Sequence, residues 1–591
     1  MIEARFDDLT GAEPSFRLIE PVGVLEAART GEVPGVLDAA EAALARGLWV
    51  AGFVAYEAAP GLDPALRVRA RVPGDPFAGL PFAWFAMFEG RQETTLPEPP
   101  ADAPAVDAAA WVPSVDRAAY DAAIARIHGH IAAGDTYQVN DTLRLRARIT
   151  GDPHGLYRDL CYAQRGAYAA YLDTGRYRVL SASPELFFRI DGDRISTKPM
   201  KGTAPRGRWL QEDEAIRARL QSSVKDRAEN AMIVDLLRND LGRVAREGSV
   251  TWSDVFEAER YETVWQLTST VAADLRPDAG LADVFRALFP CGSVTGAPKV
   301  STMGIIADIE DSPRGVYCGT VGYLAPRTAT GPRARFNVAI RTVVHDAETG
   351  AAEYGVGGGI TWDSRAAAEY DETVDKARVL TARRPPFRLL ETLLHEPGIG
   401  YRRLDEHLAR LRASAAYLGF ALDEEAVRDA LTREAARFPA KPARVRLLVD
   451  RRGRPETGGA PMPADPPGSV RLGVDAGHPV DPADPFLFHK TTLRGRYEEA
   501  KERHPDADDV LLTNTRGEAT ETTIANLAVR LDGRWWTPPL DAGLLPGCER
   551  AALLADGTLR ERTLSLAELA RAEDLAIYSS VRPWRRAVIA G

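Results

Sequence analysis

The sequence predicts a multidomain protein that combines α/β and α+β architecture. The chain has 591 residues, which is too long for a single hydrophobic core. From Val112 to Ala382, strand-like hairpins alternate with long helical patterns, and from Phe387 onward a separate α/β pattern begins. We therefore expect several domains, with the chemistry divided between the central and the C-terminal parts.

Two proline-rich stretches predict the domain boundaries. One is LPEPPADAPAVDAAA over residues 96–110, and the other is the short RRPP step at 383–386. We expect an N-terminal scaffold over 1–111, a catalytic domain over 112–382, a linker over 383–386 and a further domain over 387–591. The first part contains one clear helical pattern, PGVLDAAEAALARG, and no residues that point to catalysis.

Composition indicates small-molecule chemistry. The net charge is −10, with 45% hydrophobic and 27% charged residues, so no basic excess favours nucleic acid or an anionic membrane. The chain shows no apolar stretch long enough to span a bilayer, and MIEARFDDLT does not resemble a secretory signal, so we expect a cytoplasmic protein. Its four cysteines are scattered without C-x-x-C spacing, which favours neither disulfides nor a zinc site.

The segment FFRIDGDRISTKPM alternates apolar and polar residues around Asp191-Gly192. This pattern predicts a two-stranded hairpin that leads to Lys201 in the sequence PMKGT. A strand end would hold the side chain of Lys201 rigidly. The alternative is an ordinary solvated lysine, which is common on protein surfaces.

Two helical patterns each carry a pair of carboxylates. The first runs from EDEAIRARL to AREG as one expected helix ending at Gly248, with Asp226 and Glu229 on one face. The second, RAAAEYDETVDKARVL, places Glu369 and Glu372 three residues apart. Four converging carboxylates would require a cation, and Mg²⁺ is the expected one because it accepts carboxylates, waters and an anionic substrate. The alternative is a solvated ion pair between Glu372 and the lysine four residues later.

The central motifs resemble those of the chorismate-utilising family that includes anthranilate, aminodeoxychorismate, isochorismate and salicylate synthases. The matching pieces, in order, are GDTYQVN, SASPELFF, PMKGT, KDRAENAMIVDLLRND, CGSVTGAPK, FNVAIRT and YGVGGGITWDS. The resemblance implies an anthranilate synthase component I-like chorismate-binding α/β sandwich that binds Mg²⁺ directly through Glu229 and Glu372 and through water by Asp226 and Glu369. It also implies a substrate site whose residues are Arg341, Tyr323, Thr203 and the backbone of Gly357 and Gly359.

Two positions indicate which member of this family the chain resembles. Relatives that activate water carry a lysine where this chain has Gln138, so the amide argues for ammonia as the nucleophile. Lys201 stands where aminodeoxychorismate synthases carry lysine and anthranilate synthases carry alanine. Covalent catalysis by Lys201 requires a pKa lowered from about 10.4 towards 7 or 8, and Glu185 is the expected acid for the departing hydroxyl. Gln266 departs from the histidine of several relatives, and we assign it no role.

The C-terminal part resembles the fold-type IV pyridoxal-phosphate enzymes, which include class IV aminotransferases and aminodeoxychorismate lyase. The resemblance rests on FRLLETLLHEPGIGYRRLDEHLARLRASAAYLGF, a strand at ARVRLLVD, FHKTTLRGRYEEA and DDVLLTNTRGEATETTIANLAV. It implies that Lys490 binds pyridoxal phosphate covalently and that Glu521 bonds the pyridinium nitrogen. The implied phosphate cup consists of Arg410, the amides of Cys548 and Glu549, and Ser579 or Ser580. Relatives carry a tyrosine shortly after the lysine; here Gly495 falls near that place and Tyr497 lies further on.

Together the two resemblances imply a bifunctional enzyme of 4-aminobenzoate and folate biosynthesis. The central domain would convert chorismate and ammonia to aminodeoxychorismate, and the C-terminal domain would eliminate pyruvate from it. No cysteine lies in a glutaminase-like setting, so we expect a separate glutamine amidotransferase subunit, and the family suggests a homodimer through the C-terminal domain. Two alternatives stay open: an anthranilate synthase component fused to an amino-acid aminotransferase, and an active synthase with a non-catalytic C-terminal docking domain.

Overall fold

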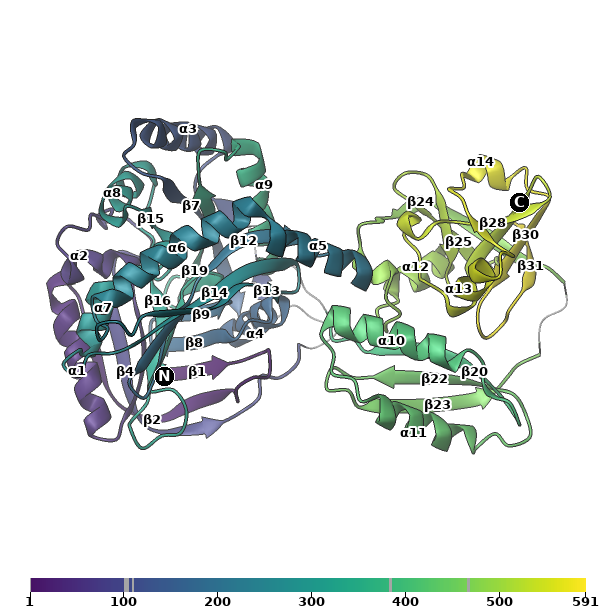
Figure 1. Cartoon of the computed structure of the whole chain (residues 1–591), viewed down its shortest axis with the longest axis horizontal. Helices are drawn as coiled ribbons and strands as arrows, with labels where there is room; N and C mark the ends of the chain where they lie inside the picture. Colours follow the sequence, from purple (N-terminus) through teal and green to yellow (C-terminus); the bar gives the residue numbers. More distant parts are fainter. Residues whose placement is uncertain (1, 100–105, 109–110, 382–384, 465–467, 591) are drawn as a thin grey trace. The chain divides into compact units, whose positions relative to one another are not determined.

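The computed structural model describes residues 2–99, 106–108, 111–381, 385–464 and 468–590. The chain forms two compact units, which Figure 1 shows in the colours of the sequence. The first unit contains residues 1–205 and 217–386, and the second contains residues 206–216 and 387–591. Parts of the two predicted boundary segments, at 100–105, 109–110 and 382–384, lie outside the described residues.

The predicted N-terminal scaffold and the predicted central domain share one sheet. Strand β1 (Ile2–Asp7) pairs with β8 (Tyr168–Thr174), and β3 (Trp49–Val54) pairs with β16 (Thr320–Leu324). These ladders join backbone groups more than a hundred residues apart, so the two parts fold as one unit. The remaining described strands of this unit are β2 (Phe16–Ala27), β4 (Ala83–Glu93), β5 (Val106–Ala108), β6 (Val112–Pro113), β7 (Gln138–Gly151), β9 (Tyr177–Ser183), β10 (Leu186–Asp191), β11 (Arg194–Lys198), β12 (Met200–Pro205), β13 (Thr251–Arg260), β14 (Val264–Asp274), β15 (Gly296–Ala297), β17 (Ala334–Val338), β18 (Thr342–Asp346) and β19 (Ala351–Ile360).

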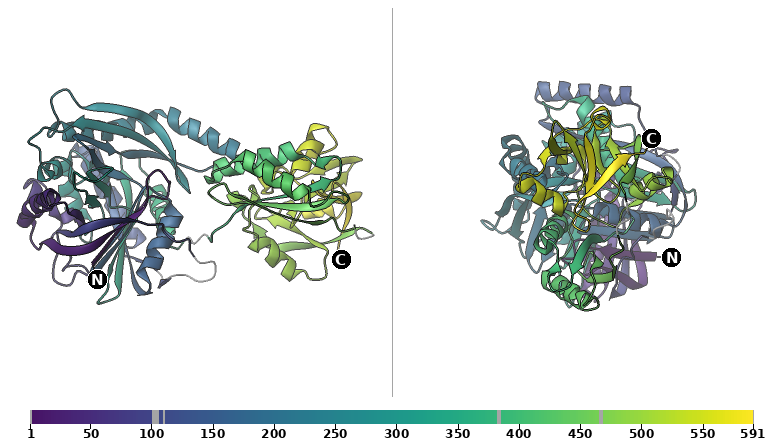
Figure 2. Two further views of the ribbon diagram at one scale, coloured as in Figure 1. Left: turned by 90° about the horizontal axis from the view of Figure 1, so that it is seen from below. Right: turned by 90° about the vertical axis from the view of Figure 1, so that its right-hand side faces the viewer.

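Helices cover the outside of this twisted sheet, as the views in Figure 2 show. The expected N-terminal helix is confirmed as α1 (Val33–Ala45). The others are α2 (Ala59–Leu62), α3 (Arg117–Ala133), α4 (Pro153–Gln164), α5 (Leu210–Ser222), α6 (Val224–Gly242), α7 (Leu281–Leu288), α8 (Lys299–Ile309) and α9 (Ala366–Ala377), of which the start of α5 belongs to the second unit.

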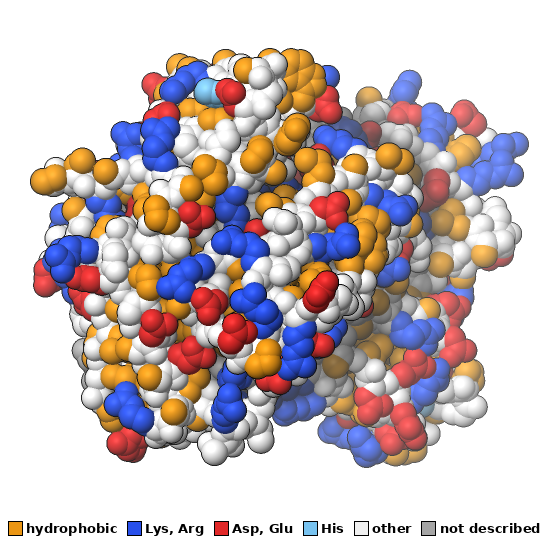
Figure 3. Space-filling view, turned by 60° about the vertical axis from the view of Figure 1, so that its left-hand side comes forward, with side chains coloured by type: hydrophobic (Ala, Val, Ile, Leu, Met, Phe, Trp, Pro, Cys, Tyr) orange, Lys and Arg blue, Asp and Glu red, His pale blue; other side chains and the backbone are white. Residues whose placement is uncertain are grey.

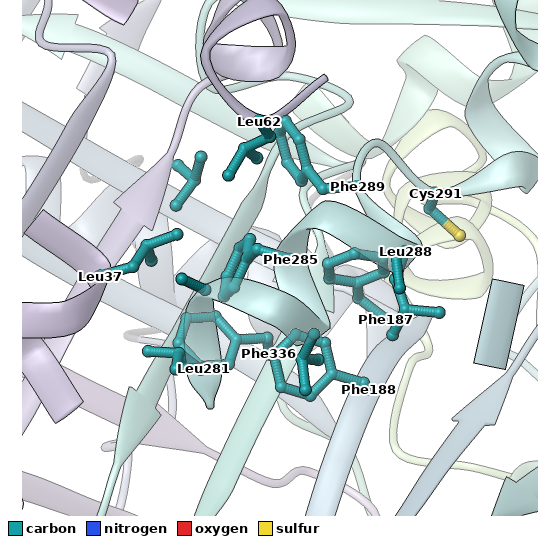
Figure 4. Packing of buried hydrophobic residues seen from close by; sticks show 14 of the residues in the cluster. Leu37, Leu62, Phe187, Phe188, Leu281, Phe285, Leu288, Phe289, Cys291 and Phe336 are labelled. Atoms are coloured by element: carbon teal, nitrogen blue, oxygen red, sulfur yellow. The ribbon is translucent and has the colours of Figure 1, made fainter. Parts of the chain in front are cut away.

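A phenylalanine cluster fills the core beneath α7. Phe188 and Phe285 meet edge to face with ring centroids 5.5 Å apart, and Phe336 lies 5.5 Å from Phe285 (Figure 4). Each such ring contributes on the order of 1.5–3 kcal/mol when fully buried. The cluster fixes strand β10 immediately after Glu185, which holds that carboxyl group in a rigid position.

The predicted hairpin before Lys201 is confirmed. Strands β10 and β11 pair antiparallel, with Asp191 opposite Arg194, and the turn uses Gly192 at a φ of +57°. Lys201 is the second residue of β12, which pairs with β14. The lysine is therefore presented from the start of a strand inside the sheet.

The single long helix expected to end at Gly248 is wrong. The chain forms α5 and α6 instead, and Ser223 separates them with extended backbone while its hydroxyl accepts a hydrogen bond from the Asp226 amide. A serine at this position caps a new helix rather than continuing the previous one. Helix α6 then ends at Gly242. The break places Asp226 in the first turn of α6, with Glu229 one turn later.

The second unit contains two sheets. The first is formed by β20 (Leu389–Glu396), β21 (Gly400–Tyr401), β22 (Ala443–Val449) and β23 (Pro455–Pro461), and α10 (Leu404–Leu418) and α11 (Glu424–Ala435) share one hydrophobic core with it. The predicted strand ARVRLLVD is confirmed as β22. The second sheet is formed by β24 (Val470–Val480), β25 (Asp509–Asn514), β26 (Ala519–Thr522), β27 (Asn526–Leu531), β28 (Arg534–Thr537), β29 (Arg560–Glu561), β30 (Asp574–Tyr578) and β31 (Arg585–Ile589). Helices α12 (Gly495–Arg503), α13 (Cys548–Ala555) and α14 (Leu566–Leu569) accompany it.

Charges of both signs are interspersed on the visible face of the first unit, without a continuous basic surface (Figure 3). This arrangement agrees with the net charge of −10. Among the described helices, none combines the length and the apolar character that crossing a membrane demands.

Candidate active sites

A cavity of about 320 Å³ in the first unit, here called the Lys201 cavity, brings together almost all the predicted residues of the central domain. The predicted residues that line it are Glu185, Lys201, Thr203, Asp226, Glu229, Arg341, Gly357, Gly359, Glu369 and Glu372. They come from the loop before β10, from β12, α6, β19 and α9, and from the segment between β17 and β18, so strands and their loops form one side of the cavity and two helices supply its carboxylates.

Lys201 is half-buried and packs against Gly359. A β-carbon built on Gly359 would lie 2.4 Å from the Lys201 Nζ and 2.6 Å from the Gln138 Nε2, so a methyl group there would displace the ends of these two side chains. Burial lowers the pKa of Lys201; Glu229 opposes this shift and Lys376 adds to it. The neutral, nucleophilic form of the amine is therefore more accessible than it is for a lysine in water.

Glu185 is a protonatable acid in the same cavity. Its side chain is 4% exposed, and burial raises its pKa to about 7, although Ser293 and Lys201 oppose the shift. Within the described residues its Oε1 has no hydrogen-bond partner. A carboxyl group that holds its proton near neutral pH and has an unsatisfied oxygen is suited to donate a proton to a bound molecule.

The four predicted carboxylates line the cavity from α6 and α9, but they are not preassembled as a metal site. In the part of the chain that the structure describes, no three Asp, Glu, His or Cys side chains are close enough to hold an ion. Glu372 instead pairs with Lys376 at 2.7 Å, and Lys376 donates to the Gly357 carbonyl at 2.8 Å. The all-oxygen donor set still fits Mg²⁺. Sequence reasoning noted the Glu372–Lys376 spacing, but not that Lys376 reaches the glycine strand.

The structure separates two residues that were expected to bind the substrate together. Arg341 lines the cavity, and its guanidinium donates to the Lys376 carbonyl. Tyr323 does not belong to the site: its ring is 3% exposed and packs 4.9 Å from Phe6 and 5.1 Å from Phe16. Its position on β16 turns the side chain into the aromatic core, while Tyr317 and Tyr354 line the cavity.

Gln266 also lines the Lys201 cavity, from β14 opposite Thr203. Gln138 is not among the lining residues, but its buried amide lies beside Gly359, and its Nε2 has no hydrogen-bond partner within the described residues. An amide that is buried and unsatisfied is available to a ligand. The alternation of apolar and polar residues in GDTYQVN gives no signal for this orientation.

A cavity of about 820 Å³ in the second unit, here called the Lys490 cavity, collects the predicted cofactor residues. Those that line it are Arg410, Lys490, Glu521, Cys548, Glu549, Ser579 and Ser580. They are drawn from α10, α13, β26 and the loops before α12 and after β30. These residues are spread over positions 410–580, so only the folded chain brings them close to one another.

Lys490 and Glu521 have the electrostatics of a cofactor site. Burial lowers the pKa of Lys490 to about 8, and Arg410 adds to this shift. Burial raises the pKa of Glu521 to about 7, while its carboxylate accepts hydrogen bonds from Tyr497 at 3.0 Å and from Asn526 at 3.3 Å. Tyr497, which lies further from Lys490 than the tyrosine of relatives, contacts Glu521 from the third position of α12.

A buried network, missed by sequence reasoning, supports the expected phosphate cup. Arg410 donates twice to Glu391, at 2.9 and 2.6 Å, and once to the Pro546 carbonyl at 3.2 Å. His407 contacts Glu391 at 2.7 Å through Nδ1 and the Ser580 hydroxyl at 2.8 Å through Nε2. Two features of the sequence could have predicted this network. Glu391 is an acid on an otherwise apolar strand, and His407 lies one helical turn before Arg410.

The protonation states in this network are well separated. Burial alone would raise the pKa of Glu391, but Arg410 and His407 outweigh it and lower the value to about 2. Burial alone would lower the pKa of His407, but Cys548 and Glu391 outweigh it and raise the value to about 9. At neutral pH His407 is therefore a cation that donates to Ser580. The donors in this corner fit a phosphate group, as the amides at the start of α13 do.

Two arginines on β22 face the same cavity. Arg444 and Arg446 alternate with the buried residues Val445 and Leu447, so their side chains leave the core side of the sheet and line the Lys490 cavity. Strand alternation in ARVRLLVD predicts this shared face. Two guanidinium groups on one wall favour a ligand with two negative charges.

Comparisons with known proteins agree with this division of the chain. Residues 24–382 match the chorismate binding enzyme family, and residues 388–589 match the amino-transferase class IV family, whose fold implies pyridoxal phosphate. The predicted fold class is confirmed by these matches. Anthranilate synthase component I from Streptococcus pneumoniae aligns with a TM-score of 0.55 at 26% identity, over 63% of this chain and 93% of that one.

Curated relatives of the first unit carry two different names. An aminodeoxychorismate synthase from Streptomyces griseus is 45% identical over 314 residues, which are 52% of this chain and 42% of that protein. An anthranilate synthase component 1 from Haloarcula marismortui is 37% identical over 339 residues, which are 56% of this chain and 67% of that protein. The chain spans less than half the length of the Streptomyces relative.

Proposed function

The chain belongs to the chorismate binding enzyme family, and we propose that it is a bifunctional enzyme that makes 4-aminobenzoate, a precursor of folate, from chorismate and ammonia. The first unit would form aminodeoxychorismate, and the second would eliminate pyruvate from it. The observation that carries this proposal is the half-buried Lys201 with a lowered pKa, in one cavity with the protonatable Glu185. The second cavity, with Lys490 and Glu521, supports a pyridoxal-phosphate step on an amine.

In the first reaction, Lys201 acts as the nucleophile. Its amine attacks ring C2, the two conjugated ring double bonds shift, and the C4–O bond breaks while Glu185 transfers a proton so that water leaves. Ammonia then attacks C4, the ring double bonds shift back, and the bond between C2 and Lys201 breaks to release the neutral amine, while a proton from the new ammonium group returns to Glu185. The net change replaces a hydroxyl group with an amino group. Gln138, which lies beside Lys201, offers an amide where water-activating relatives offer a lysine.

Charged side chains of the Lys201 cavity would hold the two carboxylates of chorismate. Arg341 and the backbone at Gly357 and Gly359 suit the enolpyruvyl carboxylate. Asp226, Glu229, Glu369 and Glu372 would hold Mg²⁺, which supplies positive charge for the ring carboxylate. Lys376 must release Glu372 for this, and its ammonium group then faces the same anionic substrate.

In the second reaction, Lys490 moves a proton. Pyridoxal phosphate, when bound, supplies an electron sink for the charge that develops at C4. Lys490 removes the C4 proton and returns it to the departing enolpyruvyl group, so that pyruvate leaves from C3 and the ring becomes aromatic. Glu521 holds the pyridinium proton, and Arg410 with Ser580 holds the phosphate. Arg444 and Arg446 bind the two carboxylates of a dianionic substrate.

We further propose that ammonia comes from a separate glutamine amidotransferase subunit. All four cysteines of the chain are buried, and burial raises the pKa of Cys161, Cys291 and Cys318, which opposes formation of the thiolate that a glutaminase requires.

Dimerisation through the second unit and a cytoplasmic location stay predictions.

The decisive test is a product assay. Purified protein would receive chorismate, Mg²⁺, ammonium and pyridoxal phosphate, with 4-aminobenzoate and anthranilate separated by chromatography. We expect 4-aminobenzoate and pyruvate from the wild type, no aminated product from Lys201→Ala, and accumulated aminodeoxychorismate from Lys490→Ala. Lys441→Ala, a change at an exposed lysine, should behave as the wild type.

One alternative is tested by the same assay. The anthranilate synthase name of the Haloarcula relative favours an anthranilate synthase component joined to an aminotransferase. Anthranilate as the product would support that alternative and overturn the proposed role of Lys201.

A further inference from the structure

Residues 206–216 belong to the second unit, although the residues before and after them in the sequence belong to the first. The segment follows directly on β12, the strand that carries Lys201 and ends at Pro205. Leu210 begins α5 and packs against the hydrophobic core that β20, β22, α10 and α11 share. A short piece of the chorismate-binding region is therefore built into the unit that contains Lys490.

Trp209 packs beside the chain that leads to Lys490. Its ring lies 5.0 Å from the ring of Phe488, two residues before Lys490, and it joins the buried cluster that includes Leu487. The guanidinium of Arg208 covers Trp209 at 4.6 Å from the ring centroid and pairs with Asp541 at 2.8 Å. The tryptophan is thereby enclosed between a core and a cation.

Arg206 and Gly207 hold Tyr417. The Tyr417 hydroxyl donates to the Gly207 carbonyl at 2.6 Å, and Arg206 donates to the Tyr417 carbonyl at 2.8 Å. The Arg206 guanidinium also lies 4.4 Å from the Tyr417 ring centroid, and it pairs with buried Asp213 at 2.7 Å. These contacts fix both the ring and the main chain of Tyr417.

Tyr417 in turn holds His489, the residue before Lys490. The two rings stack with centroids 4.3 Å apart and planes 20° apart, and the Ser414 hydroxyl contacts the His489 Nδ1 at 3.0 Å. Burial lowers the pKa of His489 to about 4, so the ring is neutral and packs as an aromatic surface. The next residue is Lys490 itself. Its carbonyl accepts a hydrogen bond from the Leu390 amide at 2.9 Å, which fixes the main chain of Lys490.

We propose that Arg206–Trp209 are positioning residues for Lys490, which act through Tyr417, His489 and Phe488. The inference rests on the proposed function only in treating Lys490 as the cofactor lysine. It means that a lyase unit that begins at residue 387 lacks the contacts that hold Tyr417 and Phe488 in place beside His489 and Lys490. It also means that the strand carrying the first catalytic lysine continues directly into the support of the second.

The test measures the amine of Lys490 in the cofactor-free full-length chain. Competitive labelling with acetic anhydride at a series of pH values, read by mass spectrometry, gives the midpoint at which Lys490 becomes reactive. Tyr417→Phe removes the hydrogen bond to Gly207 and keeps the ring on His489. We expect its midpoint to rise by about half a pH unit or more, because water that reaches the amine favours the charged form.

Tyr401→Phe is the matched control, since Tyr401 donates to the Leu431 carbonyl at 2.8 Å in the same unit and outside the Lys490 cavity. Its Lys490 midpoint should equal that of the wild type. Trp209→Leu should shift the midpoint in the same direction as Tyr417→Phe. An unchanged midpoint in Tyr417→Phe, or an equal shift in Tyr401→Phe, would overturn the proposal, whether or not Trp209→Leu folds.

Added pyridoxal phosphate separates this inference from the proposed function. It should protect Lys490 of the wild type from labelling. If it does not, the cofactor assignment fails while the midpoints still report on positioning. If protection occurs but the product assay yields no 4-aminobenzoate, the substrate assignment fails instead.

Discussion

Gly359 and Lys201 pack so closely that a β-carbon at position 359 would lie 2.4 Å from the Lys201 Nζ. The glycine belongs to β19 and the lysine to β12, so two strands distant in sequence together define the position of the amine. The position of Lys201 therefore depends on a residue that has no side chain.

Gly359→Ala should reduce the formation of aminodeoxychorismate by at least about a hundredfold, because the added methyl group displaces the amine from its productive position. Steady-state assay of chorismate consumption measures the effect. Gly358→Ala is a matched control, since a β-carbon there would lie 3.4 Å or more from its neighbours, Glu369 and Lys376. Equal losses in both variants would contradict a specific role for Gly359.

Glu185→Gln should lower the first reaction by about 10²–10⁴-fold, because the amide cannot give a proton to the leaving hydroxyl. The second reaction, assayed with added aminodeoxychorismate, should be unaffected. If both reactions fall together, the residue supports folding rather than proton transfer.

The same substitution should change the pH dependence of stability in the first unit. The folded-state pKa of Glu185 is raised from about 4.5 to about 7, so its ionisation destabilises the fold progressively as pH rises through this interval. At pH 8 the free energy of unfolding of Glu185→Gln should therefore exceed that of the wild type by about 3 kcal/mol, and the variant should unfold at a higher temperature. Below pH 4.5 the two proteins should unfold at the same temperature. Differential scanning calorimetry at both pH values provides the measurement.

His407 should make cofactor binding depend on pH. Its folded-state pKa is raised to about 9, so the stabilisation from its charge is fully present below about 6.5 and is lost as pH rises through 9. Above that pH the neutral ring no longer donates to Ser580, and pyridoxal phosphate affinity should fall several-fold. In His407→Gln this fall should be absent. A parallel fall in both proteins would assign it to Lys490 or to the phosphate itself.

Arg446→Met and Arg444→Met should each raise the KM of the second reaction by about tenfold to a hundredfold, because each variant loses a charged hydrogen bond to one carboxylate of the substrate. The absorbance of bound pyridoxal phosphate should be retained. Arg452→Met, a change at an exposed arginine in the turn after β22, is the control. A changed KM in the control, or loss of cofactor in the two variants, would contradict carboxylate binding.

The sequence by itself determined both families and the boundary after residue 386, but the predicted parts 1–111 and 112–382 form one unit in the structure. Local alternation identified the hairpin before Lys201 and the strand β22, and motif order identified both families, because these signals are carried by neighbouring residues. The four carboxylates, Lys490 and Glu521 were predicted in the same way. The prediction of one helix running to Gly248 was wrong because hydrophobic periodicity does not detect a helix-capping residue such as Ser223.

Only the tertiary structure decided which side chains share a cavity. Tyr323 lies in a suitable motif, yet β16 directs its ring into an aromatic core, while Gln138 and Lys201 meet across Gly359. The buried network of Glu391, His407 and Arg410, and the insertion of residues 206–216 beside His489, depend on contacts between segments far apart in the chain. Local sequence sets backbone preference and residue chemistry, whereas burial and long-range packing set the distances and pKa values on which catalysis depends.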